Sequence, residues 1–164
     1  MSTETEAIQS YSPQGLISQA LAQNVPIETL KRLMDLAERW DAKQAKRKFY
    51  EAFTAFQSEI PELIRSKKVG YESKDKTQKI NYAFTPLPKM AKAVQPYLLK
   101  YGFSYRWEYE EMPETKMKIT CVLTHKDGHS ERNFMIVKED NTGNKNNIQA
   151  IGSARSYAER YTLK

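Results

Sequence analysis

The spacing of the apolar residues changes from a helical period to a strand period along this chain, and that change limits the folds open to it. From Pro26 to Pro61 the apolar residues recur every three or four positions, as on one face of an α-helix. From Lys67 they alternate with polar residues in short runs separated by polar turns, as in strands. Strands joined by short turns pair antiparallel, and helices then cover the sheet. The sequence therefore predicts an α+β fold: an antiparallel sheet with a β-hairpin, a three-strand meander and packed helices.

The same periods set the expected elements. A short helix over 16–23 precedes either one long helix between Pro26 and Pro61 or two helices broken near Asp41. A hairpin follows over 67–84, with a cationic tip at 73–78, and then a helix that ends at Gly102 and has a kink or break at Pro96. The remaining expected elements are strands at 103–109, 117–123 and 132–138 and a final helix from 148.

The 164 residues are enough for one domain with a buried core. We expect residues 1–25 to be a flexible N-terminal segment and residues 26–164 to be that single domain. No apolar run is long enough for a bilayer, which favours a cytoplasmic protein without a membrane partner. The lone Cys121 excludes an intramolecular disulfide and is expected in the core of a strand, and His125 and His129 are expected to be exposed turn residues. We predict no metal and no cofactor.

The charge is distributed unevenly. Residues 1–40 hold three Lys or Arg and five Asp or Glu, a net charge of −2, and the rest of the chain carries +8. A basic body with many of the chain's ten tyrosines favours nucleic acid over a membrane as partner. The alternative is a basic assembly or interaction protein that meets an acidic partner.

Motifs for catalysis are missing from the sequence. There is neither a G-x-x-x-x-G-K-[ST] loop nor a G-x-G-x-x-G loop, which argues against an ATP-driven recombinase or helicase. Glu108, Glu110 and Glu111 cluster, but a nuclease centre needs carboxylates that converge from separate elements around Mg²⁺. A metal-dependent nuclease is therefore the weakest alternative, and we expect a protein that is not an enzyme.

Basic residues interleaved with aromatic ones are the positive evidence, because single strands bind to a cationic track lined by stacking rings. The candidate DNA-binding residues are Lys67, Lys68, Tyr71, Lys74, Lys76, Lys79 and Tyr82 in the hairpin, Arg106 in the meander, and Arg155, Tyr157 and Arg160 in the last helix. The hairpin lysines can equally be solvated turn residues.

Two apolar faces look structural rather than DNA-binding. Alternate residues from Phe103 to Tyr109 form an aromatic face that is more typical of a core, which leaves Arg106 on the other face of that strand. In the last helix, a core-facing stripe is expected at Ile151, Ala154, Ala158 and Tyr161. Arg155 and Arg160 fall off this stripe, so phosphate contacts and salt bridges between subunits are both open to them.

The run Gly152-Ser-Ala-Arg-Ser-Tyr-Ala-Glu-Arg-Tyr-Thr-Leu resembles the closing motif of the Erf superfamily of phage single-strand annealing proteins. Further landmarks precede it in the family's order: Ala52–Gln57 before Pro61, Val69–Tyr71, Asn81–Ala83, Pro96–Gly102, Leu123–His125 and Gly128–His129. The chain departs from the family pattern in Ile80-Asn-Tyr-Ala-Phe-Thr, where Tyr-x-Tyr-Ala-x-Leu is usual. It also stops at Lys164, so we expect a C-terminal tail to be absent.

This resemblance implies binding and annealing of single-stranded DNA without ATP, in phage-type recombination in the host cytoplasm. It implies a homo-oligomer, ring or helical, with the fold of ring-forming annealing proteins. The implied partners are single-stranded DNA, the annealed duplex, and a phage exonuclease or a host single-strand binding protein.

Overall fold

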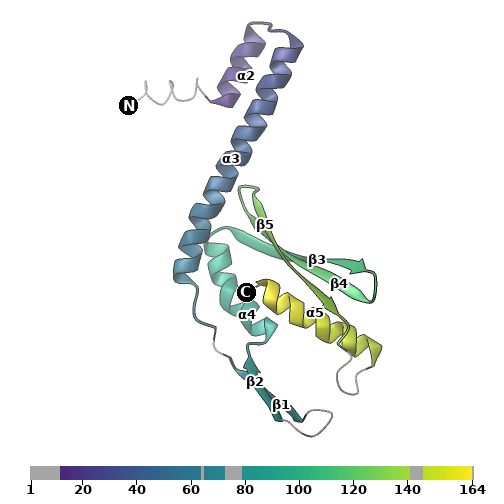
Figure 1. Cartoon of the computed structure of the whole chain (residues 1–164). Helices are drawn as coiled ribbons and strands as arrows, with labels where there is room; N and C mark the ends of the chain where they lie inside the picture. Colours follow the sequence, from purple (N-terminus) through teal and green to yellow (C-terminus); the bar gives the residue numbers. More distant parts are fainter. Residues whose placement is uncertain (1–11, 64, 73–78, 141–145, 164) are drawn as a thin grey trace. The chain divides into compact units, whose positions relative to one another are not determined.

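The computed structural model describes residues 12–63, 65–72, 79–140 and 146–163. In this part the helices are α2 (Pro13–Ala22), α3 (Ile27–Glu59), α4 (Leu87–Lys100) and α5 (Asn147–Leu163). The strands are β1 (Lys67–Glu72), β2 (Lys79–Phe84), β3 (Phe103–Met112), β4 (Lys116–His125) and β5 (Ser130–Lys138) (Figure 1). The predicted α+β class is confirmed, with one antiparallel sheet of order β1-β2 and another of order β3-β4-β5. None of the described helices combines the length and the apolar character that a membrane crossing requires.

The chain divides into two compact units. The N-terminal unit comprises Met1–Tyr50 with Asp127–His129, and the C-terminal unit comprises Glu51–Lys126 with Ser130–Lys164. The boundary between the units falls inside α3, which is one continuous helix. The single-helix alternative is therefore correct, and Asp41 lies within the helix rather than at a break.

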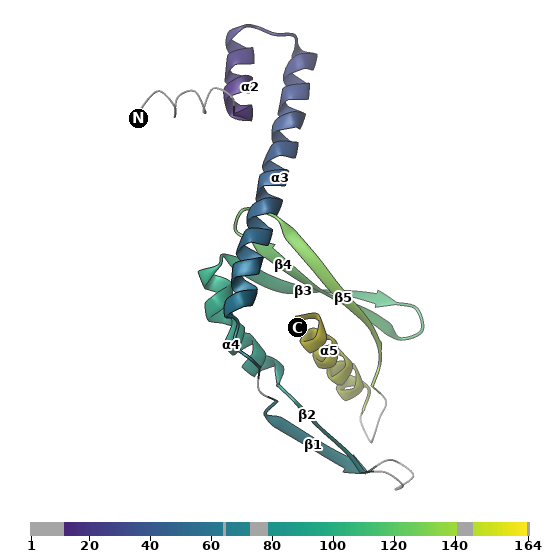
Figure 2. The ribbon, with the colours of Figure 1, turned by 60° about the vertical axis from the view of Figure 1, so that its left-hand side comes forward.

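The N-terminal unit is a helical hairpin of α2 and the first part of α3 (Figure 2). The predicted short helix is present as α2, and it begins three residues earlier than expected because Ser12 caps it and Pro13 opens it. The Ser12 hydroxyl accepts a hydrogen bond from the Gly15 backbone N–H at 3.1 Å. Ala20 and Ala37 are buried, since small side chains let two helices approach closely.

Both histidines were expected to be exposed, and that expectation is wrong. His125 is only 4% exposed, and its ring lies 5.0 Å from that of Phe103. In the N-terminal unit the His129 ring lies 5.1 Å from that of Phe49, which is almost fully buried. Aromatic partners far away in the sequence cover these turn residues, and no local pattern could reveal them.

The three-strand meander forms the centre of the C-terminal unit. Trp107 pairs with Cys121, which pairs in turn with Asn133, so these side chains share one face of the sheet. Helix α5 packs on this face across β4 and β5, while α4 lies along β3 (Figures 1 and 2). Ile119 on β4 is fully buried, and rings of Phe53, Phe56 and Phe103 fill one end of the core.

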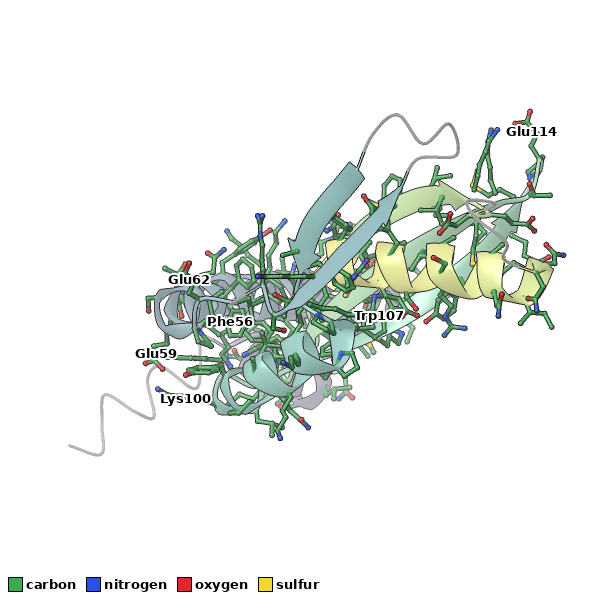
Figure 3. The ribbon with its side chains drawn as sticks, turned by 90° about the horizontal axis from the view of Figure 1, so that it is seen from below. Phe56, Glu59, Glu62, Lys100, Trp107 and Glu114 are labelled. Atoms are coloured by element: carbon green, nitrogen blue, oxygen red, sulfur yellow. The ribbon has the colours of Figure 1, made fainter. Side chains whose placement is uncertain are left out.

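Helix α4 ends as predicted, and of the two alternatives expected at Pro96, a kink or a break, the break is absent. The helix runs without interruption through Pro96, because the loss of one backbone N–H is offset by burial of Met90 and Leu98 on either side. Gly102 follows the helix with a φ of +73°, a backbone conformation that glycine adopts without steric cost. An ion pair between Lys100 and Glu59 joins the ends of α4 and α3 (Figure 3).

The predicted hairpin is present as β1 and β2, with Lys67 paired to Phe84 and Glu72 paired to Lys79. Its expected cationic tip, residues 73–78, lies outside the described residues.

Cys121 is buried in the core as expected, with 5% of its surface exposed. Burial raises the pKa of the Cys121 thiol from 9.0 to about 11, because the thiolate would lose its hydration. Near pH 8 we expect the folded protein to react with iodoacetamide about a hundredfold more slowly than the urea-unfolded chain. Between pH 9 and 11 only the unfolded chain ionises this thiol, so the folding stability should fall as the pH rises through that window. Equal alkylation rates in both states would contradict the burial.

Candidate nucleic-acid interface

Three polar contacts fix helix α5 on the meander. Trp107, which is labelled in Figure 3, donates a hydrogen bond from Nε1 to Thr162 Oγ1 at 3.1 Å. Asn133 Nδ2 donates to the backbone oxygen of Thr162 at 3.3 Å, and Tyr109 Oη donates to Glu159 Oε1 at 2.7 Å. The aromatic face of β3 is therefore the structural face that the sequence predicted. These contacts orient α5 and so decide which of its residues point away from the sheet.

The buried row of α5 differs from the predicted stripe. The buried residues are Ala150, Ala154, Ala158, Glu159 and Thr162. Tyr161 was expected in the core, but 48% of it is exposed. Because Trp107 and Tyr109 already fill the sheet face, the helix approaches it with its smallest side chains and turns Tyr161 outward.

Arg155 is engaged within the chain. Its Nε donates to Glu159 Oε1 at 2.8 Å, and one of its terminal nitrogens, Nη2, donates to Tyr109 Oη at 2.7 Å. Its guanidinium carbon also lies 3.9 Å from the centre of the Tyr109 ring. Burial, together with the hydrogen bond to Glu159, raises the pKa of Tyr109, so the phenol stays a donor. Arg155 thus helps to hold α5 against the sheet, while half of its side chain remains exposed.

A pocket of about 310 Å³ opens on the other side of α5. It is lined by Leu63, Arg65, Ala83, Phe84, Thr85, Met90, Tyr157, Arg160 and Tyr161. We call it the Arg160 pocket. The rings of Tyr157 and Tyr161 lie 4.5 Å apart at one side of it, and each tyrosine is nearly half exposed. Among the described residues, the pocket lining therefore combines an accessible pair of aromatic rings with two arginines.

Arg160 is the central cation of this pocket. Its guanidinium carbon lies 4.0 Å from the centre of the Phe84 ring and 5.8 Å from that of Tyr157. Its Nε is shielded from solvent and has no hydrogen-bond partner among the residues that the structure describes. Among the described residues no carboxylate forms an ion pair with Arg160. An arginine that is stacked but not hydrogen-bonded keeps its donors for a ligand with acceptor oxygens.

Two of the predicted DNA-binding residues, Tyr157 and Arg160, meet in the Arg160 pocket. Lys67 lies beside it, with Nζ 5.8 Å from the centre of the Phe84 ring, and Lys68 is exposed on β1. Arg106 and Arg155 do not line the pocket.

For the other predicted DNA-binding residues of the hairpin, the structure describes at most the backbone. Lys74 and Lys76 lie outside the described residues. Tyr71, Lys79 and Tyr82 are placed only by the strand register, opposite Ile80, Glu72 and Val69 respectively.

Sequence reasoning missed Arg65, Phe84 and Tyr161 as lining residues. Phe84 ends the predicted second hairpin strand, and Tyr161 follows Tyr157 by one helical turn, which is the signal for an adjacent ring pair. For Arg65 the sequence holds no such signal.

The other face of the meander carries ion pairs. Glu108 joins Arg106 at 2.7 Å and Arg132 at 2.9 Å, and Glu110 joins Lys118 at 3.1 Å. In the described ranges no three His, Cys, Asp or Glu side chains gather as metal ligands. Glu108 and Glu110, two of the carboxylates considered for a nuclease centre, are thus paired with cations.

One of three comparisons with known proteins found a match. The family model described as "ERF superfamily" matches residues 49–164, which include the whole Arg160 pocket. No curated protein and no solved structure matches the chain. The superfamily groups phage-type recombination proteins that anneal DNA and are generally not catalytic. Because the match covers well over half of its length, this chain belongs to the ERF superfamily.

Proposed function

We propose that this protein binds single-stranded DNA and anneals complementary strands without ATP. The observation that carries the proposal is the guanidinium of Arg160. It is stacked on Phe84, beside the half-exposed rings of Tyr157 and Tyr161, and no other described residue forms a hydrogen bond with it. Membership in a family of annealing proteins supports it.

The chemistry of the Arg160 pocket suits a single strand. The guanidinium donates to phosphate oxygens in charge-assisted hydrogen bonds, and the tyrosine rings offer faces on which bases stack. Neither contact depends on base identity, because every nucleotide has a phosphate and every base has a π-face. Such a site holds any sequence, as an annealing protein must.

The wider DNA track is proposed from position and charge. Lys67 and Lys68 are exposed on β1 and extend the cationic surface beside the pocket, and Arg65 adds a charge on the pocket wall. We propose that Tyr71, Lys74, Lys76, Lys79 and Tyr82 of the hairpin also contact the DNA. We also keep Arg106 and Arg155, which would exchange their ion pairs with Glu108 and Glu159 for phosphate.

The biological setting is proposed from the family. The protein would act as a homo-oligomer, ring or helical, in phage-type recombination, and would work with an exonuclease or a host single-strand binding protein. It would need no cofactor and catalyse no reaction, and its place would be the host cytoplasm, where the DNA is.

A strand-annealing assay without nucleotide or metal tests the proposal. Two complementary oligonucleotides labelled with a fluorophore and a quencher are mixed with the purified chain, and the quenching rate is compared with the rate without protein. We expect a marked acceleration that falls steeply with salt, because bound phosphates release counterions. Binding without acceleration would reduce the function to single-strand binding. No binding would favour an assembly protein with an acidic partner.

A further inference from the structure

We propose that the exposed basic face of α3 in the N-terminal unit is a second binding surface for the sugar-phosphate backbone of DNA. This inference rests on the proposed function, and it places the surface outside the Arg160 pocket and largely outside the residues that the family model matches. The surface consists of Arg32, Arg39, Lys43, Lys46, Arg47 and Tyr50, all of them exposed, and we call it the basic stripe.

The stripe follows from helical geometry. At 100° per residue these six side chains fall within about 100° of the helix circumference. With a rise of 1.5 Å per residue they extend over about 27 Å from Arg32 to Tyr50. No carboxylate lies within this face between the two ends, although Asp35 lies at its edge. The arrangement presents one row of positive charge along the helix.

Three cations of the stripe differ from Lys31 and Lys48 of the same helix in their ion pairing. Lys31 pairs with Glu28 at 3.2 Å, and Lys48, on the opposite side of the helix, pairs with Asp127 at 3.1 Å. Arg32, Arg39 and Lys43 enter no ion pair with any described residue. Neighbouring like charges repel one another, so Arg32, Arg39 and Lys43 are more stable once an external polyanion lies along them.

Aromatic side chains accompany the row, which favours a nucleic acid over an acidic protein. The Tyr50 ring is 46% exposed, and Lys46 Nζ lies 5.9 Å from its centre. Trp40, which follows Arg39 in the sequence, is 50% exposed. Exposed rings among cations are the combination that binds both the bases and the phosphates of a flexible strand.

A pair of double variants tests the stripe. Lys43→Gln/Lys46→Gln removes two charges from it, and Lys31→Gln/Lys48→Gln removes two charges of the same kind from other sides of the same helix. Binding of a fluorescent thymidine oligonucleotide is measured by anisotropy as a function of salt, with circular dichroism as the check on folding. Acylation of lysines with and without the oligonucleotide, read by mass spectrometry on the wild-type chain, gives a second measurement.

The stripe variant should bind about three- to thirtyfold more weakly at low salt than the wild type. Its slope of log affinity against log salt should fall by about 1.4, since each lost phosphate contact contributes about 0.7 for single strands. The control should keep the wild-type slope, and the oligonucleotide should protect Lys43 and Lys46 from acylation but not Lys31.

Three results would overturn the inference. Wild-type affinity and slope in the stripe variant would remove the stripe from the DNA track, while the annealing activity could still stand. Equal losses in both double variants would show an effect of net charge rather than of this face. A wild-type chain that binds no oligonucleotide would end both this inference and the proposed function.

Discussion

Replacement of Arg160 by glutamine should weaken binding of single-stranded DNA about ten- to a hundredfold, because hydrogen bonds from a charged donor contribute about 1.5–3 kcal/mol. The side chain has no hydrogen-bond or ion-pair partner among the described residues, so its removal breaks only its stacking on Phe84 and Tyr157. We therefore expect the melting temperature to change little. Fluorescence anisotropy with a labelled oligonucleotide and a thermal melt are the two measurements.

Two further variants make this result specific. Arg160→Lys keeps the charge but loses the planar group that stacks on Phe84, so it should recover only part of the affinity. Arg132→Gln removes an exposed arginine that is paired with Glu108 outside the pocket, and should bind like the wild type. Unchanged binding by Arg160→Gln would take the Arg160 pocket out of the DNA track.

The largest effect on stability is expected at Ile119. Ile119→Ala should lower the free energy of unfolding by about 2–5 kcal/mol, since the side chain is fully buried in the central strand on the face that α5 covers. Urea unfolding followed by circular dichroism measures the change. Oligonucleotide binding should be retained while the variant is folded, because no side chain of the Arg160 pocket is altered. On heating, binding should be lost earlier than in the wild type because the variant unfolds earlier.

Ile136→Ala is the matched control for this prediction. The same side chain is lost there from β5, where 47% of it is exposed, so the cost should stay below about 1 kcal/mol. Equal destabilisation by both variants would contradict the placement of Ile119 beneath α5.

The elements were predictable because their signals are local. Helical and strand periods and Gly102 after α4 depend on residues close together in the sequence. The start of α2 at Pro13 was missed, although Ser12 and Pro13 are a local signal for it. The continuity of α4 through Pro96 was not predictable, since it depends on how Met90 and Leu98 are buried by other elements.

The candidate site was only partly predictable for the same reason. The motif and the interleaved charges identified Tyr157 and Arg160, but an amphipathic pattern alone assigned Tyr161 to the core. Which side of α5 is buried depends on the opposite surface, where Trp107 and Tyr109 contact Thr162 and Glu159. Arg155 forms hydrogen bonds within the chain, whereas Arg160 forms none with a described residue, and this difference is likewise a tertiary property.

The alanine row of α5 has a consequence for the geometry of binding. Ala150 and Ala158 are completely buried and Ala154 nearly so, so their methyl groups set the distance between the helix axis and the sheet. A larger residue there would push α5 outward and carry Arg160 away from Phe84 without altering either residue. The three alanines thus determine how far Arg160 lies from Phe84.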